Sequence, residues 1–249
     1  MKALIFAAGL GTRLKPFTET HPKALVTVNG IPMLERTIRR IADAGITDIV
    51  INIHHFPDQI RSFLKENNNF GANITLSDES RLLLDTGGGI AKAAQFLEDS
   101  DPVLVCNADI LTDLDIRKMF DAHNKSNSDV TLLAQQRNTS RYLYFDPKTR
   151  LLVGWHNNKT GESRPETFFP DPALLKRAFG GYHILSPNAL DLISRMSATK
   201  PFGIIPWYID NLHKISISEY DQTEKYQWFD IGTPETLENA RTKFIEQTR

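Results

Sequence analysis

The sequence predicts an α/β fold built on a doubly wound, mostly parallel sheet. Short apolar runs, typical of buried strands, alternate with stretches whose apolar residues recur at helical spacing. The chain has 249 residues, enough for a sizeable core. Strands that alternate with helices need crossover connections, and such connections produce parallel sheets with helices on both faces.

The first half of the chain carries most of this alternation. An apolar run over residues 2–8 opens the chain, and further strands are predicted at Ile49–Ile53, Ile74–Leu76, Val103–Cys106 and Val130–Leu133. Helices are predicted at Leu34–Ala44, Asp58–Lys65, Ile90–Leu97 and Ile116–His123. Gly45 follows the first of these helices, at the position where glycine most often ends a helix.

After about Gln136 the alternation stops, and a small insertion of hairpin and helix is predicted. Two strands, Tyr142–Phe145 and Leu151–Trp155, flank a turn that contains Pro147, which favours a hairpin. The remaining predictions are an irregular loop at Asn157–Pro172, strands at Ala178–Leu185 and Gln227–Ile231, a helix at Asn188–Met196, and a last helix from Pro234 with Thr233 as its N-cap.

A glycine-rich turn follows the first apolar run. It consists of Ala8, Gly9, Leu10, Gly11, Thr12 and Arg13, and Pro22-Lys23 comes ten residues later. Glycines let backbone N–H groups approach an anion, and the two cations, Arg13 and Lys23, neutralise its charge, which favours a triphosphate. The turn lacks the Gly-Lys-Ser/Thr of a P-loop, Leu14 breaks a dinucleotide fingerprint, and the protein-kinase motifs are absent.

This N-terminal motif resembles that of the sugar-1-phosphate nucleotidyltransferases. The resemblance implies a Rossmann-like nucleotidyltransferase fold in which residues 8–13 bind a nucleoside triphosphate. It also implies catalytic roles for Arg13, which stabilises the transition state, and for Lys23, which contacts phosphates. One domain over 1–249 is expected, with 1–136 mainly nucleotide-binding and 137–249 mainly sugar-binding and carrying a C-terminal metal ligand.

Two acids directly follow strand-like runs. Asp109 closes Asn107-Ala108-Asp109, and Asp230 precedes Ile231-Gly232-Thr233. Taken alone, each acid favours a structural role, such as capping a loop or the next helix, over Mg²⁺ binding. Mg²⁺ is usually held by one or two carboxylates plus phosphates. The family resemblance implies that Asp109 and Asp230 are the Mg²⁺ ligands and that Asn107 contacts the nucleotide, although Ala108 stands where a glycine is commoner.

The segment Asp85-Thr86-Gly87-Gly88-Gly89 precedes a predicted helix. We expect Thr86 to cap that helix and the glycines to form a flat backbone ledge. The resemblance implies that Asp85 and Gly88 contact the nucleobase, and this version of the segment is most similar to uridylyltransferases acting on N-acetylmuramate 1-phosphate. Those enzymes are short, and the present chain ends at Arg249 without hexapeptide repeats.

The sugar side is less well defined by the sequence. The resemblance implies that Gly181 lies beneath the sugar, while a glycine inside a strand is also typical of a bulge. Gly154-Trp155-His156-Asn157 stands where many relatives have Glu-Lys-Pro, which leaves the sugar open. The pair His54-His55 is expected in a loop at a strand end rather than on a metal, and Cys106 in the core.

Composition excludes several classes of partner. The formal net charge is −1 and the pI is about 6.7, so the chain has no strong field for nucleic acid or anionic membranes. No apolar run approaches the ~20 residues of a membrane span, and the single cysteine cannot form an internal disulfide. We therefore expect a cytoplasmic enzyme with no nucleic-acid or membrane partner; the sequence leaves its oligomeric state open, a homo-oligomer included.

The expected reaction is transfer of a nucleoside monophosphate from a triphosphate to a sugar 1-phosphate, with release of pyrophosphate and dependence on Mg²⁺. UTP with N-acetylmuramate 1-phosphate, a substrate of cell-wall recycling, is the first choice. GTP with a mannose- or heptose-type 1-phosphate is the second. Two other classes are a nucleotide-sugar-binding regulator on the same fold and a nicotinamide-dependent dehydrogenase, and Leu14 argues against the latter.

Overall fold

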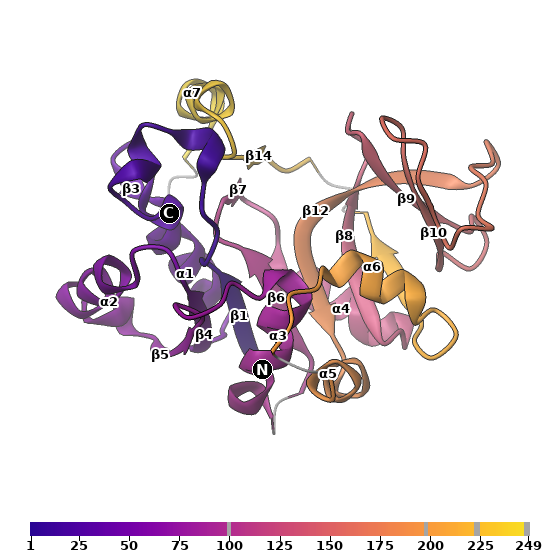
Figure 1. The fold of residues 1–249 in the computed structure, drawn as a ribbon, viewed down its shortest axis with the longest axis horizontal. Helices are drawn as coiled ribbons and strands as arrows, with labels where there is room; N and C mark the ends of the chain where they lie inside the picture. Colours follow the sequence, from indigo (N-terminus) through magenta and orange to yellow (C-terminus); the bar gives the residue numbers. More distant parts are fainter. Residues whose placement is uncertain (99–100, 197–198, 222–224, 247–249) are drawn as a thin grey trace. The chain divides into compact units, whose positions relative to one another are not determined.

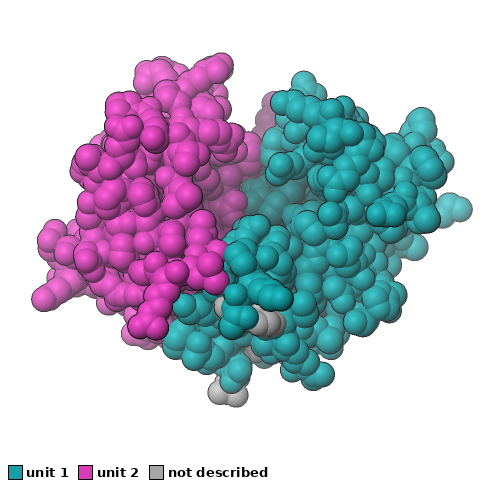
Figure 2. Space-filling view, viewed as in Figure 1, with its two compact units in different colours: residues 1, 84–105, 117–223 teal, residues 2–83, 106–116, 224–249 magenta. Residues whose placement is uncertain are grey.

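The computed structural model of the chain describes residues 1–98, 101–196, 199–221 and 225–246, and its elements are drawn in Figure 1. The chain divides into two compact units, each made of several segments of the sequence (Figure 2). Unit 1 contains Met1, residues 84–105 and residues 117–223, and unit 2 contains residues 2–83, 106–116 and 224–249. Among the described residues, no helix combines the length and apolar character that crossing a membrane would require.

Unit 2 contains a parallel sheet. Strand β4 lies between β1 and β5 and is parallel to both, in register from Ile49 opposite Ala3 and Ile74. The strands and helices are β1 (Lys2–Phe6), β2 (Thr27–Val28), β3 (Ile31–Pro32), α1 (Met33–Asp43), β4 (Asp48–Ile53), α2 (Pro57–Glu66), β5 (Asn73–Asp78), β7 (Ile110–Thr112), β14 (Trp228–Asp230) and α7 (Pro234–Lys243). Short 3₁₀ helices are η1 (Thr12–Leu14), η2 (Phe17–Glu19), η3 (Lys23–Leu25) and η4 (Asn68–Gly71).

Both ends of the chain contribute to one apolar cluster in unit 2. It joins Leu14 and Val26 of the N-terminal segment to Leu111 of β7 and to Ile231 and Phe244 near the C-terminus. Thr233 caps α7: its hydroxyl accepts from the backbone N–H of Thr236, as predicted for this position. The loop after β1 and the turn after β14 therefore pack against the same apolar cluster.

Unit 1 is largely antiparallel. Strand β12 pairs antiparallel with β8 and β9, β9 with β10 and β10 with β11, while β13 runs parallel to β8. Its elements are α3 (Asp85–Leu97), α4 (Ile116–Ser126), β8 (Val130–Gln135), β9 (Arg141–Phe145), β10 (Leu152–Asn157), β11 (Ser163–Arg164), β12 (Leu175–Leu185), α5 (Pro187–Ser194), α6 (Ile204–Asp210) and β13 (Ile217–Tyr220). Strand β6 (Val103–Asn107) is divided between the units.

The core of unit 1 contains polar side chains that are paired. His183 and Tyr208 are both buried and share a hydrogen bond of 2.6 Å between the imidazole Nδ1 and the phenol oxygen. Burial lowers the pKa of His183 to about 3 and raises that of Tyr208. Glu219 is ion-paired with Arg150 and Arg177, and burial nevertheless raises the pKa of its carboxyl. The buried imidazole of His183 is therefore neutral in the folded protein near neutral pH.

The α/β prediction is confirmed, and the sheet is mixed. The predicted strands and helices of the first half are all present, and their ends differ from the prediction by at most three residues, except that α3 begins five residues earlier than predicted. The hairpin at 142–155 is present as β9 and β10. Helix α6 and the strands β2, β3, β7, β11 and β13 have no counterpart in the sequence-based prediction. Strand β11 lies inside the segment predicted as an irregular loop, where it pairs with β10. Gly45 has a φ of 92° just after α1, as expected of a C-terminal glycine.

Candidate functional site

The glycine loop directly follows β1 in unit 2. Gly11 has a φ of 63°, and a Cβ at this position would lie 2.7 Å from Cγ2 of Thr18. The Thr18 hydroxyl donates to the Gly11 carbonyl at 2.8 Å, which ties the loop to η2. Gly9 and Leu10 are exposed, and a Cβ at Gly9 would meet nothing within 4 Å. Gly11 is thus required by conformation and close packing, and Gly9 leaves open space for a ligand.

A buried polar network supports the start of this loop. Oδ1 of Asn52 accepts hydrogen bonds from the backbone N–H groups of Ala7 (2.7 Å) and Ala8 (3.2 Å). Its Nδ2 donates to Oε1 of Glu79 at 2.8 Å, and the exposed fractions of Asn52 and Glu79 are 3% and 1%. The sequence analysis missed both residues. The feature of the sequence that could have indicated Asn52 is that its amide interrupts the otherwise apolar run at 49–53.

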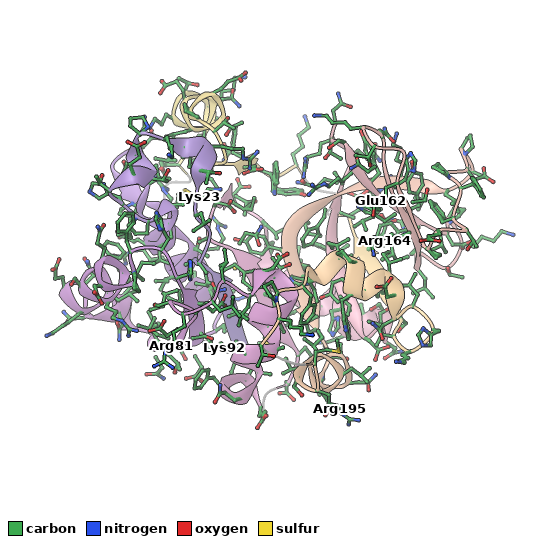
Figure 3. All side chains as sticks on the ribbon, viewed as in Figure 1. Lys23, Arg81, Lys92, Glu162, Arg164 and Arg195 are labelled. Atoms are coloured by element: carbon green, nitrogen blue, oxygen red, sulfur yellow. The ribbon has the colours of Figure 1, made fainter. Side chains whose placement is uncertain are left out.

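Lys23 connects the N-terminal segment to the mid-chain acid. It lies at the start of η3, and its ammonium forms an ion pair with the carboxylate of Asp109, with side chains that are 13% and 25% exposed. Lys23 is also labelled in Figure 3. The backbone N–H of Ala108 donates to the Phe6 carbonyl at 3.1 Å. The loop after β1 and the Asn107–Asp109 turn therefore lie next to each other in unit 2.

Asp230 is brought to Asp109 by a two-stranded ribbon. β14 pairs antiparallel with β7, with Asp230 opposite Ile110, and the N–H of Ile231 donates to the Asp109 carbonyl at 2.8 Å. A Cβ at Gly232 would lie 2.9 Å from Oδ1 of Asp230 and 3.0 Å from Nη2 of Arg13. The backbones of the two aspartates are thus neighbours, and the Arg13 guanidinium reaches the Asp230 turn.

This set of side chains suits a hard divalent cation. Among the described residues, no group of three or more His, Cys, Asp and Glu side chains forms a metal-holding cluster. A metal at Asp109 and Asp230 would therefore complete its shell with phosphate and water oxygens, as Mg²⁺ commonly does. Asn107, the last residue of β6, is partly exposed two residues before Asp109.

The glycines after Asp85 do not form the predicted ledge. Helix α3 begins at Asp85, so Thr86 is inside the helix and not its N-cap; its hydroxyl accepts from the N–H of Ile204 at 2.9 Å. The N–H groups of Gly87 and Gly88 donate to the Phe202 carbonyl, and a Cβ on Gly87 would lie 2.3 Å from the Phe202 ring. These glycines permit close packing of 200–203 against the helix.

Gly181 lies at an irregularity of β12. The register between β12 and β8 shifts between Phe179 and His183, and Gly181 has a φ of 79°. This is the bulge that glycine in a strand typically marks. A Cβ on the preceding Gly180 would lie 2.6 Å from the Leu133 side chain. Asp85, Gly88 and Gly181 all belong to unit 1, whereas residues 8–13, Lys23, Asn107, Asp109 and Asp230 belong to unit 2.

Two minor expectations are also settled by the structure. β4 ends at Ile53, so His54 and His55 lie in the loop after it; their rings contact the carbonyl oxygens of Glu79 (2.7 Å) and Thr18 (3.2 Å). Cys106 is fully buried. Both predictions are confirmed, and neither residue type adds a ligand to the candidate site.

Comparisons with known proteins agree with this geometry. The sequence profile of the nucleotidyl transferase family matches residues 2–247. An N-acetylmuramate alpha-1-phosphate uridylyltransferase of Neisseria meningitidis serogroup B is 43% identical over 248 residues, 97% of each chain. A mannose-1-phosphate guanyltransferase of Yarrowia lipolytica is 30% identical over 241 residues, and the match covers 94% of this chain but 61% of that protein.

Solved structures share the fold. A putative glucose-1-phosphate thymidylyltransferase from Bacillus anthracis superposes with a TM-score of 0.80 at 20% identity, covering 100% of this chain and 98% of that one. HddC from Yersinia pseudotuberculosis, complexed with GMP-PN, superposes with a TM-score of 0.74 at 23% identity, covering 98% and 99%. The family profile matches residues 2–247, and the Neisseria relative matches this chain over 97% of both lengths; the chain therefore belongs to the nucleotidyl transferase family.

Proposed function

We propose that the protein transfers a nucleoside monophosphate from a nucleoside triphosphate to a sugar 1-phosphate, with release of pyrophosphate. The observation that carries the proposal is the convergence of the glycine loop, Lys23, Asp109 and Asp230 within unit 2. Both reactants are phosphates, so the reaction needs positioning and charge neutralisation rather than a covalent intermediate.

Each side chain has a definite task in this proposal. The exposed loop at Gly9 binds the triphosphate through backbone N–H groups. Arg13 neutralises charge on the β- and γ-phosphates and on the leaving pyrophosphate. Lys23, already at the Asp109 carboxylate, neutralises the α-phosphate and the attacking sugar phosphate. Asp109 and Asp230 would hold Mg²⁺, which when bound polarises phosphate oxygens and lowers the cost of the charge that develops on them.

UTP and N-acetylmuramate 1-phosphate are the proposed substrates. The name of the 43%-identical relative, which this chain matches over 97% of both lengths, supports them. Such an enzyme would act in the cytoplasm in the recycling of cell-wall sugars. GTP with a mannose- or heptose-type 1-phosphate is the second candidate, supported by the guanyltransferases, although the chain spans about three-fifths of the first of them.

Two measurements test the proposal. A thermal-shift panel of UTP, GTP, CTP, ATP and dTTP with Mg²⁺ identifies the nucleotide, because a bound ligand raises the apparent stability. Pyrophosphate release with N-acetylmuramate, mannose and heptose 1-phosphates then identifies the sugar. Nucleotide binding without pyrophosphate release from any combination would contradict the proposal and favour a regulator that only binds nucleotide sugars.

The role of Asp109 can be tested by substitution, with a control substitution at another aspartate of unit 2. Asp109→Asn should lower kcat at least ~100-fold, which corresponds to about 3 kcal/mol of lost transition-state stabilisation. Asp58→Asn makes the same change on α2 at a carboxylate that is 96% exposed, and should leave kcat unchanged. A folded Asp109→Asn protein that turns over like the control removes Asp109 from the metal site.

A further inference from the structure

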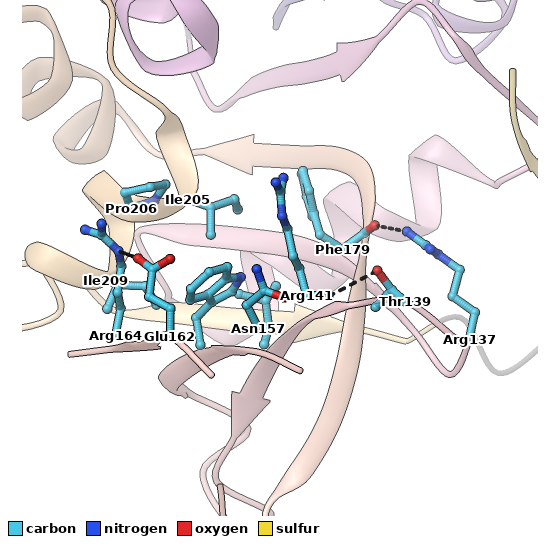
Figure 4. Close-up of a pocket in the computed structure, with 12 residues that line it drawn as sticks. Arg137, Thr139, Arg141, Asn157, Glu162, Arg164, Phe179, Ile205, Pro206 and Ile209 are labelled. Atoms are coloured by element: carbon cyan, nitrogen blue, oxygen red, sulfur yellow. Dashed lines mark hydrogen bonds and ion pairs between the residues drawn. The ribbon is translucent and has the colours of Figure 1, made fainter. Parts of the chain in front are cut away.

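Unit 1 contains a pocket that includes Trp155 and Asn157, from the segment 154–157 for which the sequence left the sugar open. Its volume is about 490 Å³, within the range of small-molecule sites. Figure 4 shows that its floor is formed by strands and that α6 borders it. The lining residues include Arg137, Thr139, Arg141, Leu143, Trp155, Asn157, Glu162, Arg164, Phe179 and, from α6, Ile205, Pro206 and Ile209.

Strand register explains why these residues share one face. Asn157 lies directly opposite Arg141, and Trp155 lies directly opposite Leu143, in the β9–β10 ladder. Residues two apart in a strand point to the same side, so all four side chains project from one face of the sheet. Arg164 of β11 continues the row opposite Trp155. The pocket therefore combines an aromatic surface with polar groups from neighbouring strands.

The pocket has an excess of positive charge. Glu162 and Arg164 neutralise each other through an ion pair of 3.0 Å, and they are labelled in Figures 3 and 4. Arg137 donates to the Phe179 carbonyl at 2.8 Å and to Oε1 of Gln135 at 3.2 Å, so its guanidinium is held by neighbouring groups. The guanidinium of Arg141 makes no hydrogen bond or ion pair with any residue that the structure describes, and it extends between Ile205 and Phe179 (Figure 4).

We infer that this pocket binds a sugar that carries a carboxylate, with Arg141 as the residue that selects it. A guanidinium presents two parallel N–H donors that match a carboxylate, and the pocket offers no unpaired acid to oppose an anion. Trp155 and Phe179 supply apolar surface for the ring. The inference rests on the proposed function and narrows it, because N-acetylmuramate has a carboxylate and mannose has none.

Steady-state kinetics with two matched sugars test the inference. N-acetylmuramate 1-phosphate and N-acetylglucosamine 1-phosphate differ only in the lactyl ether that carries the carboxylate. Arg141→Gln should lower kcat/KM for the acidic sugar about 10- to 100-fold, the cost of one charge-assisted hydrogen bond, and change it less than about 3-fold for the neutral sugar. Arg195→Gln, at an exposed arginine on the C-terminal end of α5 (Figure 3), is the matched control.

Direct binding separates this inference from the proposed reaction. Calorimetry with free N-acetylmuramate and free N-acetylglucosamine needs no turnover, and the wild type should bind the acid more tightly while Arg141→Gln loses the preference. Equal losses in kcat/KM for the two sugar 1-phosphates would mean that Arg141 contacts a group that both share, such as the phosphate, and would overturn the inference. A preference that depends on Arg141 in a protein without pyrophosphate release would uphold the pocket and contradict the proposed function.

Discussion

Replacing Asn52 by leucine should weaken both the fold and triphosphate binding. The substitution keeps roughly the same volume but removes three hydrogen bonds, two accepted from Ala7 and Ala8 and one donated to Glu79. A buried polar group that loses a hydrogen bond costs about 1–3 kcal/mol. The backbone N–H groups of Ala7 and Ala8 and Oε1 of Glu79 each lose their bond to Asn52, so we expect a loss of about 3–5 kcal/mol in the free energy of unfolding.

Urea denaturation of the Asn52→Leu protein measures that loss, and a matched variant calibrates it. Asn73→Leu makes the same change at an exposed asparagine at the start of β5, where a single 3.1 Å hydrogen bond to Asp48 is removed. It should cost less than about 1 kcal/mol. A difference between the two variants smaller than about 1 kcal/mol would refute the assignment of stability to the buried network.

The double variant Asn52→Leu/Glu79→Leu separates the hydrogen bonds from packing. Because it removes both partners, it should be less destabilised than the sum of the single changes. In the single Asn52→Leu protein the start of the loop after β1 loses its hydrogen bonds to Asn52. The increase in Tm that the preferred triphosphate causes should therefore be smaller than in the wild type, measured without urea. An unchanged shift would mean that the loop holds its position without Asn52.

Three further changes test the framework around the site. Gly87→Ala places a Cβ 2.3 Å from the Phe202 ring and should cost about 1–3 kcal/mol in urea unfolding, with recovery when Phe202 is also changed to leucine. Thr233→Ala removes the cap of α7 and should lower stability by about 1 kcal/mol, whereas Thr233→Ser should not. His183 has a pKa of about 3 in the folded protein and near 6.5 when exposed, so the unfolded state binds its proton first as pH falls. Stability should therefore decline from about pH 6.5 towards pH 3, by up to about 1.4 kcal/mol per pH unit; a flat profile would contradict the burial of a neutral imidazole.

Local patterns in the sequence were sufficient to predict the parallel part of the fold. The apolar run at 49–53 and the glycine at position 45 depend on neighbours in the chain, and both predictions are confirmed by β4 and by the end of α1. The same holds for Thr233, whose capping partner is three residues away. Predictions of this kind need no information about distant segments.

Features that depend on distant contacts were not predictable in the same way. Gly87 and Gly88 were expected to form a flat ledge, yet they lie inside α3, where Phe202, more than a hundred residues later, packs against them. The buried pair of Asn52 and Glu79 is joined across 27 residues, and neither residue alone indicates the other. The pocket at Arg141 likewise depends on the register of β9 against β10, which a sequence pattern does not fix.

The pairing of β7 with β14 has a consequence for the order in which the chain folds. The hydrogen bond from Thr112 to the Gln227 carbonyl closes a loop of 115 residues, and Asp230 enters the ribbon only three residues later. Closing a loop of that length is slow compared with forming local helices. A chain folded only as far as Asp109 thus presents its glycine turn with one aspartate and acquires the second when β14 pairs with β7. Bringing the two aspartates together is accordingly a late event in folding.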